Sequence, residues 1–216
     1  MLSCGPRLWL YHYHLEASKT DDVAHKVNPH RYKAAHVLHE ECQTITSFSC
    51  VNSFLSNIVV AACSDRSLAI HDMAVERCVR RIVDAHGKPV TKIVHNAPLA
   101  GTTHANDAYE LFLTAATDDT VKLWDLRKPG GCVRVFSSHV NRTHTVGCAF
   151  SPCLRYVATG SEDRRAFLYD VSSGKVVERW RGGHTDVVAD VAFNPLHPQL
   201  ATACLDGHVR FFSDTA

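Results

Sequence analysis

ATDDTVKLWD, residues 116–125, is one of four similar stretches that decide the fold of this chain. Each stretch has an aspartate in a polar turn, then alternating apolar residues, and an aromatic residue or a histidine near its end. The other three are ACSDRSLAIHD (62–72), SEDRRAFLYD (161–170) and LDGHVRFFS (205–213). A repeat of fixed period predicts an array of one supersecondary unit, and this prediction limits both the folds and the functions that the chain can have.

A second marker keeps step with these endings. The endings lie 53, 45 and 43 residues apart, and the dipeptides Ala85-His86, Ser138-His139 and Gly183-His184 are 53 and 45 residues apart. Two independent markers with the same spacing argue against a chance similarity. The first interval is longer because residues 96–109 are polar, small and Gly/Pro-bearing, and we predict that they form an inserted loop.

Between the markers, apolar residues alternate or form short runs, as in TVGCAF (145–150) and QLATA (199–203). Pro, Gly, Asn and Asp bound these runs, and no long helical face interrupts them. The pattern predicts short antiparallel strands, about four per unit. We therefore predict an all-β chain that forms one domain over 1–216, with an incomplete unit at 1–39 and successive units at 40–83, 84–137, 138–181 and 182–216.

The order of histidine, turn aspartate and terminal Trp124-Asp125 resembles the WD40 repeat over most of residues 31–216. The resemblance implies a β-propeller whose units each supply strands d, a, b and c in chain order. It also implies a hydrogen-bonded tetrad of His, Ser or Thr, Asp and Trp that stabilises each blade. The residues that match the tetrad positions are His86, Asp118, Trp124, His139, Ser161, Asp163, Tyr169, His184 and Asp206.

The predicted tetrads differ in completeness. The nearest match is His139, Ser161 and Asp163, with Tyr169 in place of the tryptophan. Because a buried polar group without a partner is costly, we expect the incomplete blades to rely on apolar packing. We also expect Asp163 to contribute more stability than Asp119, which lies one position past a turn aspartate.

Two other units depart further from the pattern. Ala116 stands at the position predicted for the hydroxyl beside Trp124. In the final unit, Cys204 stands at that position and Phe212 replaces the tryptophan. We therefore expect no hydroxyl in either of these two tetrads.

Both ends of the array look incomplete in the sequence. RLWLYHYH (7–14) alternates like a strand c after the turn Gly5-Pro6, with strands a and b of its blade absent, and four residues follow Phe212. We expect four units plus a stray strand, arranged as an open arc of a propeller. Such a chain is expected to be a fragment or short isoform of a longer protein, and to pair with the missing blades or with itself through exposed edges.

Composition excludes several classes of protein. The net charge is +1, with 45% hydrophobic and 21% charged residues, so no global field attracts nucleic acid or membranes. No apolar run approaches the length of a membrane span, and the N-terminus lacks the features of a signal peptide. Nine cysteines, an odd number without a Cys-x-x-Cys pair, favour reduced thiols in an intracellular protein, cytoplasmic or nuclear.

Two groups of residues have the side-chain types of a catalytic or metal site. His36, His39 and Cys42 have the residue types of a zinc site but lack a matching ligand pair, so we predict no metal and no cofactor. A hydrolase triad of His139, Ser161 and Asp163 is disfavoured, because this serine aligns with a buried structural position and no nucleophile elbow is present. The sequence therefore predicts a protein that is not an enzyme.

Four cations remain as a candidate contact surface. The resemblance places Arg66, Lys88, Arg142 and Arg164 in loops that open on one rim of the propeller. The leading hypothesis is a non-catalytic protein-interaction scaffold that offers this rim to an acidic peptide or protein. A nucleic-acid or nucleosome-binding module that uses the rim arginines is the alternative, a hydrolase is the least favoured, and ordinary solvated charge stays open for the four cations.

Overall fold

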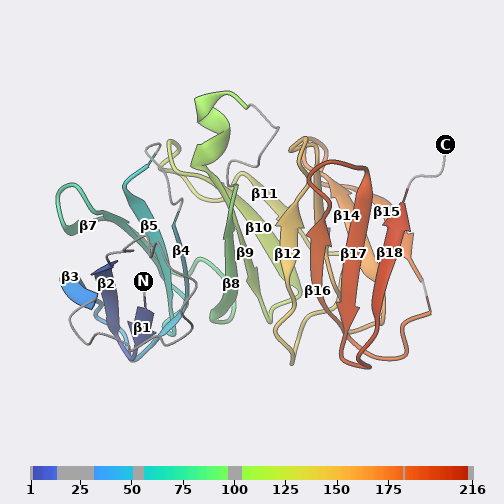
Figure 1. Cartoon of the computed structure of the whole chain (residues 1–216), viewed down its shortest axis with the longest axis horizontal. Helices are drawn as coiled ribbons and strands as arrows, with labels where there is room; N and C mark the ends of the chain where they lie inside the picture. The colour runs from blue at the N-terminus through green and yellow to red at the C-terminus, as the bar shows by residue number, and fades with distance from the viewer. Residues whose placement is uncertain (1, 14–31, 51–55, 97–103, 182, 214–216) are drawn as a thin grey trace, which may run out of the picture.

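The chain forms five antiparallel β-sheets in a computed structural model, which describes residues 2–13, 32–50, 56–96, 104–181 and 183–213. The sheets follow one another in chain order (Figure 1). Their strands are β1 (Leu2–Cys4), β2 (Arg7–Tyr13), β3 (Tyr32–His39); β4 (Ile45–Cys50), β5 (Ile58–Cys63), β6 (Leu68–Asp72), β7 (Arg77–Ile82); β8 (Val90–His95), β9 (Leu111–Ala116), β10 (Thr120–Asp125), β11 (Arg134–Phe136); β12 (Cys148–Phe150), β13 (Tyr156–Thr159), β14 (Ala166–Asp170), β15 (Val176–Trp180); and β16 (Val188–Phe193), β17 (Gln199–Cys204), β18 (Val209–Ser213).

Each four-stranded sheet is a meander in which consecutive strands pair. The first strand of each sheet lies beside the first strand of the next, so β1 neighbours β4, β4 neighbours β8, β8 neighbours β12, and β12 neighbours β16. Figure 1 shows the sheet of β1–β3 at one end of the molecule and the sheet of β16–β18 at the other. The predicted all-β fold, a partial propeller in the form of an open arc, is confirmed.

The core lies between neighbouring sheets, because successive side chains of a strand point to opposite faces. In β9, Phe112 packs in a cluster with Val60 of the preceding sheet, whereas Leu113 packs in a cluster with Val157 of the following sheet. Burying a side chain of this size contributes about 1.5–3 kcal/mol. Each of the three inner sheets is therefore stabilised on both faces by its neighbours, whereas the sheets β1–β3 and β16–β18 each pack against one neighbour.

The turn between the second and third strands has the same backbone in four sheets. The residue after the turn aspartate has a positive φ in each: 71° at Arg66, 62° at Asp119, 67° at Arg164 and 84° at Gly207. Only glycine adopts this left-handed conformation without a steric cost. The four repeats thus share one turn geometry, and three of them carry strain at it.

The N-terminal sheet corrects one prediction. β1 pairs with β2, with Leu2 opposite Trp9 and Cys4 opposite Arg7, and Gly5 turns between them at a φ of 57°. The prediction that strand b of this blade is absent is wrong, because β1 pairs with β2 in that position and three residues suffice for a short hairpin arm. β3 then pairs along the other side of β2.

Two further features concern the insertion and the last sheet. At the end of the predicted loop at 96–109, Asn106–Glu110 form a 3₁₀ helix that extends one residue past it, and residues 97–103 lie outside the described part. Across the described segments, the last sheet has three strands, β16-β17-β18. Nowhere in those segments is a helix long and apolar enough to cross a membrane.

Candidate functional site

In the four sheets from β4 to β18, the connection between the second and third strands lies at the same end as the connection from one sheet to the next, and we call this end the loop rim. All four cations that the sequence singled out (Arg66, Lys88, Arg142 and Arg164) are exposed there. Arg66 and Arg164 occupy the left-handed turn position, whereas Lys88 and Arg142 lie in the connections that precede β8 and β12. Ion pairs and hydrogen bonds with the surrounding loops determine how much of the charge of these four side chains is available to a partner.

Acidic neighbours compensate two of these cations. Arg66 forms an ion pair with Asp84 at 2.7 Å, and Arg142 Nε donates to Asp119 at 2.8 Å. Lys88 Nζ donates to the backbone carbonyl of Arg142 at 3.3 Å, so loops of two neighbouring sheets meet. The loop rim is therefore a mixed-charge surface.

A carboxylate fixes the loop that carries Arg142. Glu162 Oε1 accepts backbone hydrogen bonds from Arg142, Thr143 and His144 at 2.8, 2.6 and 2.8 Å. Burial opposes ionisation of Glu162, but these three donors outweigh it and lower its pKa. Asp119 adds a bond from the Asn141 amide at 2.7 Å. The loop is thus held in one conformation before any partner arrives.

Beneath the rim, the sheet β8–β11 contains a complete tetrad. Thr114 Oγ1 lies 2.7 Å from His86 Nε2 and accepts the indole N–H of Trp124 at 2.8 Å. His86 Nδ1 lies 3.1 Å from Asp118, which also accepts the Gly87 amide at 2.8 Å. The prediction of a missing hydroxyl at Ala116 is wrong, because the hydroxyl comes from Thr114, two residues earlier.

Asp118 is the charged member of this tetrad. Burial alone would raise its pKa, but hydrogen bonds from His86, Thr120 and the Gly87 amide hold the pKa well below its usual range. Trp124 stacks on Phe112, with ring centroids 6.1 Å apart. The polar tetrad is therefore continuous with the apolar core between the sheets.

The sheet β12–β15 was predicted to be the nearest match, and its bonds are arranged differently. The Tyr169 hydroxyl lies 3.0 Å from His139 Nδ1 and accepts the Ser138 amide at 3.0 Å. Ser161 Oγ accepts the Val140 amide at 3.0 Å. His139, Ser161 and Asp163 are therefore not joined into one chain of hydrogen bonds.

Among the residues predicted to form the tetrad of this sheet, two buried atoms lack partners in the described part of the chain, namely Nε2 of His139 and Oδ1 of Asp163. Burial lowers the pKa of His139 to about 4, so its ring is neutral near pH 7. The corresponding threonine, Thr159, donates instead to the Gly147 carbonyl at 3.1 Å. In this sheet the hydroxyl of Tyr169, rather than a threonine or an aspartate, is therefore the hydrogen-bond partner of His139.

In the final sheet, Thr202 supplies the hydroxyl, at 2.7 Å from His184 Nε2. The prediction that Cys204 leaves this position without one is therefore wrong for the same reason as at Ala116. Asp206 accepts the Thr185 amide at 3.0 Å. Phe212 replaces the tryptophan as predicted and stacks on Trp180 of the preceding sheet at 5.3 Å.

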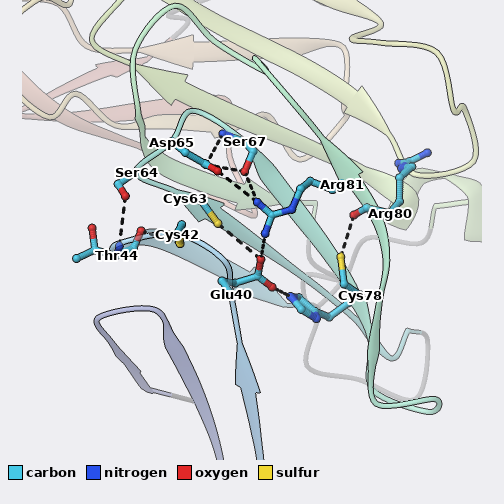
Figure 2. A network of polar contacts seen from close by, with 11 residues as sticks. Glu40, Cys42, Thr44, Cys63, Ser64, Asp65, Ser67, Cys78, Arg80 and Arg81 are labelled. Carbon is cyan, nitrogen blue, oxygen red and sulfur yellow. Dashed lines mark hydrogen bonds and ion pairs between the residues drawn. The ribbon is translucent and has the colours of Figure 1, made fainter.

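The sheet β4–β7 has a network that the sequence did not predict (Figure 2). Glu40, only 3% exposed, forms ion pairs with His71 and Arg81. Arg81 also donates to Ser67 at 2.9 Å, and Ser67 donates to Asp65 at 2.6 Å. Burial opposes the charged form of Arg81, but the carboxylate of Glu40 outweighs it and raises the pKa of Arg81. The signal that could have found this network is a histidine at the position of Trp124.

The geometry gives no support to a hydrolase triad. Ser161 is fully buried, and its Oγ is used by the backbone. An apolar groove of about 610 Å³ lies between the last two sheets, lined among others by Tyr156, Trp180 and Phe212. Neither His139, Ser161 nor Asp163 lines it. A nucleophile needs access to substrate and an adjacent base, and this serine has neither.

The chain is similar in sequence to a family of repeat proteins and to several of its members. Residues 130–170 and 174–213 match the family described as WD domain, G-beta repeat. The chain is 24% identical over 142 residues to the WD repeat domain-containing protein 83 homolog of Dictyostelium discoideum, covering 66% of this chain and 42% of that protein. It is 26% identical over 172 residues to the Gastrulation defective protein 1 homolog of Drosophila melanogaster, covering 74% and 24%.

A third relative is Nuclear distribution protein PAC1 of Ajellomyces capsulatus, 29% identical over 133 residues, covering 60% of this chain and 27% of that protein. The chain thus spans between a quarter and about two fifths of the length of these relatives. Both matched segments end at the close of a third strand, at Asp170 and Ser213. The family repeat and the sheets described above therefore share a boundary.

Proposed function

We propose that this chain, whose residues 130–170 and 174–213 match the WD40 repeat family, acts as a non-catalytic scaffold whose loop rim binds other proteins. The observation that carries the proposal is the fixed rim loop, in which Glu162 and Asp119 hold the backbone that displays Arg142. A loop that is already ordered loses less conformational entropy on binding. The displayed cations suit an acidic peptide segment of a partner protein.

The charge pattern favours a protein over a nucleic acid as the partner. Nucleic-acid binding draws on many unpaired cations and falls steeply with salt. On the rim, Arg66 pairs with Asp84 and Arg142 pairs with Asp119. A surface with both signs of charge contributes specificity and association rate in protein complexes. We also propose an intracellular location, which suits nine free cysteines, three of them buried.

Affinity capture with rim variants tests the proposal. Lys88 and Arg164 are changed to Glu, whereas Arg66 and Arg142 are changed to Gln, so that no new carboxylate faces Asp84 or Asp119. We expect the variant to lose captured proteins and keep the midpoint of its denaturation curve. The control reverses four exposed cations at the other ends of the strands: Arg77, Lys128, Arg155 and Lys175.

Two outcomes would contradict the proposal. Equal capture by the rim variant and the control would remove the rim as the contact surface. Capture that is lost when nuclease is added, and that falls by orders of magnitude in moderate salt, would favour the nucleic-acid alternative instead.

We further propose that β18 pairs with a strand from a longer chain or from a second copy. Val209 is 59% exposed and Phe211 is 73% exposed on this edge strand, and exposed apolar edges are pairing sites. We expect oligomers by light scattering at micromolar concentration, and more monomer after Val209→Lys and Phe211→Lys. A monodisperse wild-type monomer would contradict this.

A further inference from the structure

Three side chains of the final sheet gather at the loop rim with the chemistry of metal ligands. His184 precedes β16, Cys204 ends β17, and Asp206 lies in the turn that leads to β18. One potential ligand atom from each lies within 4.8 Å of the others. We propose that these residues bind a divalent transition-metal ion, and that the ion is zinc.

The orientation of His184 is the first argument. Its Nε2 lies 2.7 Å from Thr202 Oγ1, whereas its Nδ1 is buried without a partner among the described residues, and the whole residue is only 7% exposed. If Nε2–H donates to Thr202, Nδ1 presents a lone pair. Histidines that bind metals show this arrangement, because a hydrogen bond at the other nitrogen fixes the tautomer and the ring.

Comparison with the sheet β8–β11 shows what is unusual about this histidine. There, the corresponding nitrogen of His86 lies 3.1 Å from Asp118 and is satisfied. In the final sheet, the carboxylate oxygens of Asp206 accept hydrogen bonds from other groups, the backbone amides of Thr185 at 3.0 Å and His208 at 2.9 Å. The imidazole nitrogen that is paired in one sheet is therefore available in the other.

The thiol is the second argument. Cys204 occupies the position of Ala116 in the sheet β8–β11 and of Ser161 in the sheet β12–β15. It is buried, and its Sγ lies 3.2 Å from the Asp186 carbonyl. The corresponding residue of the sheet β4–β7 is also a cysteine, Cys63, but its thiol faces the carboxylate of Glu40. Thiolate, imidazole and carboxylate together suit zinc, while a magnesium or calcium site would need mainly oxygen.

The spacing requires only a small adjustment. Ligand atoms bound at 2.0–2.3 Å in a tetrahedron lie roughly 3.3–3.8 Å from one another. The ligand atoms lie within 4.8 Å of one another, and we expect rotation of the Cys204 side chain to close the remaining distance of about 1 Å while Asp206 keeps its bonds to the amides of Thr185 and His208. The thiol releases its proton to solvent as the zinc–sulfur bond forms.

His208 is the candidate for the fourth ligand. Its Nδ1 lies 3.2 Å from Asp206 Oδ1, close to the separation of two ligands on one ion, and its side chain is 69% exposed. An ion shared by residues before β16, at the end of β17 and before β18 would tie all three strands of the last sheet together.

The test uses the full chain, stripped with a chelator and titrated with zinc chloride against a chromophoric chelator. We expect one equivalent to bind, and cobalt in its place to give a thiolate charge-transfer band. Cys204→Ala should abolish the band and weaken zinc binding by about 100-fold or more, since even a lost outer partner costs about 10–100-fold. His208→Ala should weaken binding by a smaller factor.

Cys204→Ala should fold, because alanine already stands at this position in the sheet β8–β11. Cys153→Ala, at an exposed cysteine outside the cluster, is the matched control and should bind zinc as the wild type does. A wild-type chain that binds no zinc would overturn the proposal. A cobalt band that survives Cys204→Ala would also overturn it, because the thiol ligand would lie elsewhere.

Discussion

Two neighbouring blades hold their histidines by different means. In the sheet β8–β11, the hydroxyl of Thr114 joins the rings of His86 and Trp124, and Asp118 completes the chain. In the sheet β12–β15, Tyr169 brings its own hydroxyl to His139. The aspartate and the threonine of that sheet are then left to other partners or to none.

The difference teaches that one substitution can redirect a whole polar network. Tryptophan donates only, so it needs an acceptor such as Thr114, whereas a tyrosine hydroxyl both donates and accepts. Once Tyr169 binds His139 Nδ1, that nitrogen is no longer available to Asp163. Stability in the first blade should therefore depend on buried hydrogen bonds, and in the second blade on packing.

The largest effect is expected from the two threonines. Thr114→Val leaves His86 and Trp124 with buried groups that lack partners, at about 1–3 kcal/mol each, so we expect a loss of about 3 kcal/mol. Thr159→Val should cost about 1 kcal/mol, because its hydroxyl only supplements the Gly147 carbonyl, which also accepts the Gly160 amide. Urea denaturation of both variants measures this, and equal losses would remove the distinction between the blades.

The pH dependence of stability should report on His139. Its pKa is lowered by burial to about 4 from 6.5, so between these values the unfolded chain binds a proton that the folded chain does not. Stability therefore falls as pH falls from 6.5 towards 4, by about 2 kcal/mol between pH 7 and pH 5 for this group. Denaturation curves at these two pH values measure the loss.

His139→Gln should reduce that pH dependence, and the part that remains should come from His95, whose pKa burial also lowers to about 4, and from His184, whose pKa burial lowers as well. Asp118 should respond at a different pH. Since its folded pKa is depressed, its contribution is present above the unfolded pKa and disappears only in more acidic solution. An unchanged slope in His139→Gln would show that His139 is not buried in its neutral form.

Asp119 and Asp163 should differ less in their contributions to stability, and in the opposite order to the one that the sequence predicts. Asp119 accepts the Asn141 amide at 2.7 Å and Arg142 Nε at 2.8 Å. Asp163 has a buried oxygen without a partner and lies 3.7 Å from Arg165 Nε. We expect Asp119→Ala to cost about 1–2 kcal/mol and Asp163→Ala less than about 1 kcal/mol. Thermal melts rank the two, and a larger loss at Asp163 would restore the sequence prediction.

The smallest effect is expected at the strained turn of the second blade. Arg164 has a φ of 67°, whereas Gly207 takes the corresponding position in the last sheet without strain. Arg164→Gly should raise stability by roughly 0.5–1 kcal/mol, less the added flexibility of the unfolded chain. The matched variant Arg66→Gly should gain less, because it also breaks the ion pair with Asp84. A loss of stability in Arg164→Gly would show that the arginine side chain makes contacts that stabilise the folded protein.

Much of the fold could be predicted from the sequence because its signals are local. Alternation of apolar residues placed the strands, and a repeated aspartate placed the turns. The hydroxyl positions could not be predicted in the same way. Thr114 and Ala116 lie two residues apart in one strand and point to the same face, so only the position of the His86 ring selects between them. The short strand Leu2–Cys4 was missed because three residues carry too little pattern.

By itself, the sequence determined the repeat, the all-β fold and the order of the blades, because each depends on residues close together in the chain. Only the tertiary structure decided which polar groups meet. Glu40 reaches Arg81 across 41 positions of sequence, and Asp119 reaches Arg142 across 23. Such pairs depend on how neighbouring sheets pack, and no local pattern encodes the distance between two side chains that the fold brings together.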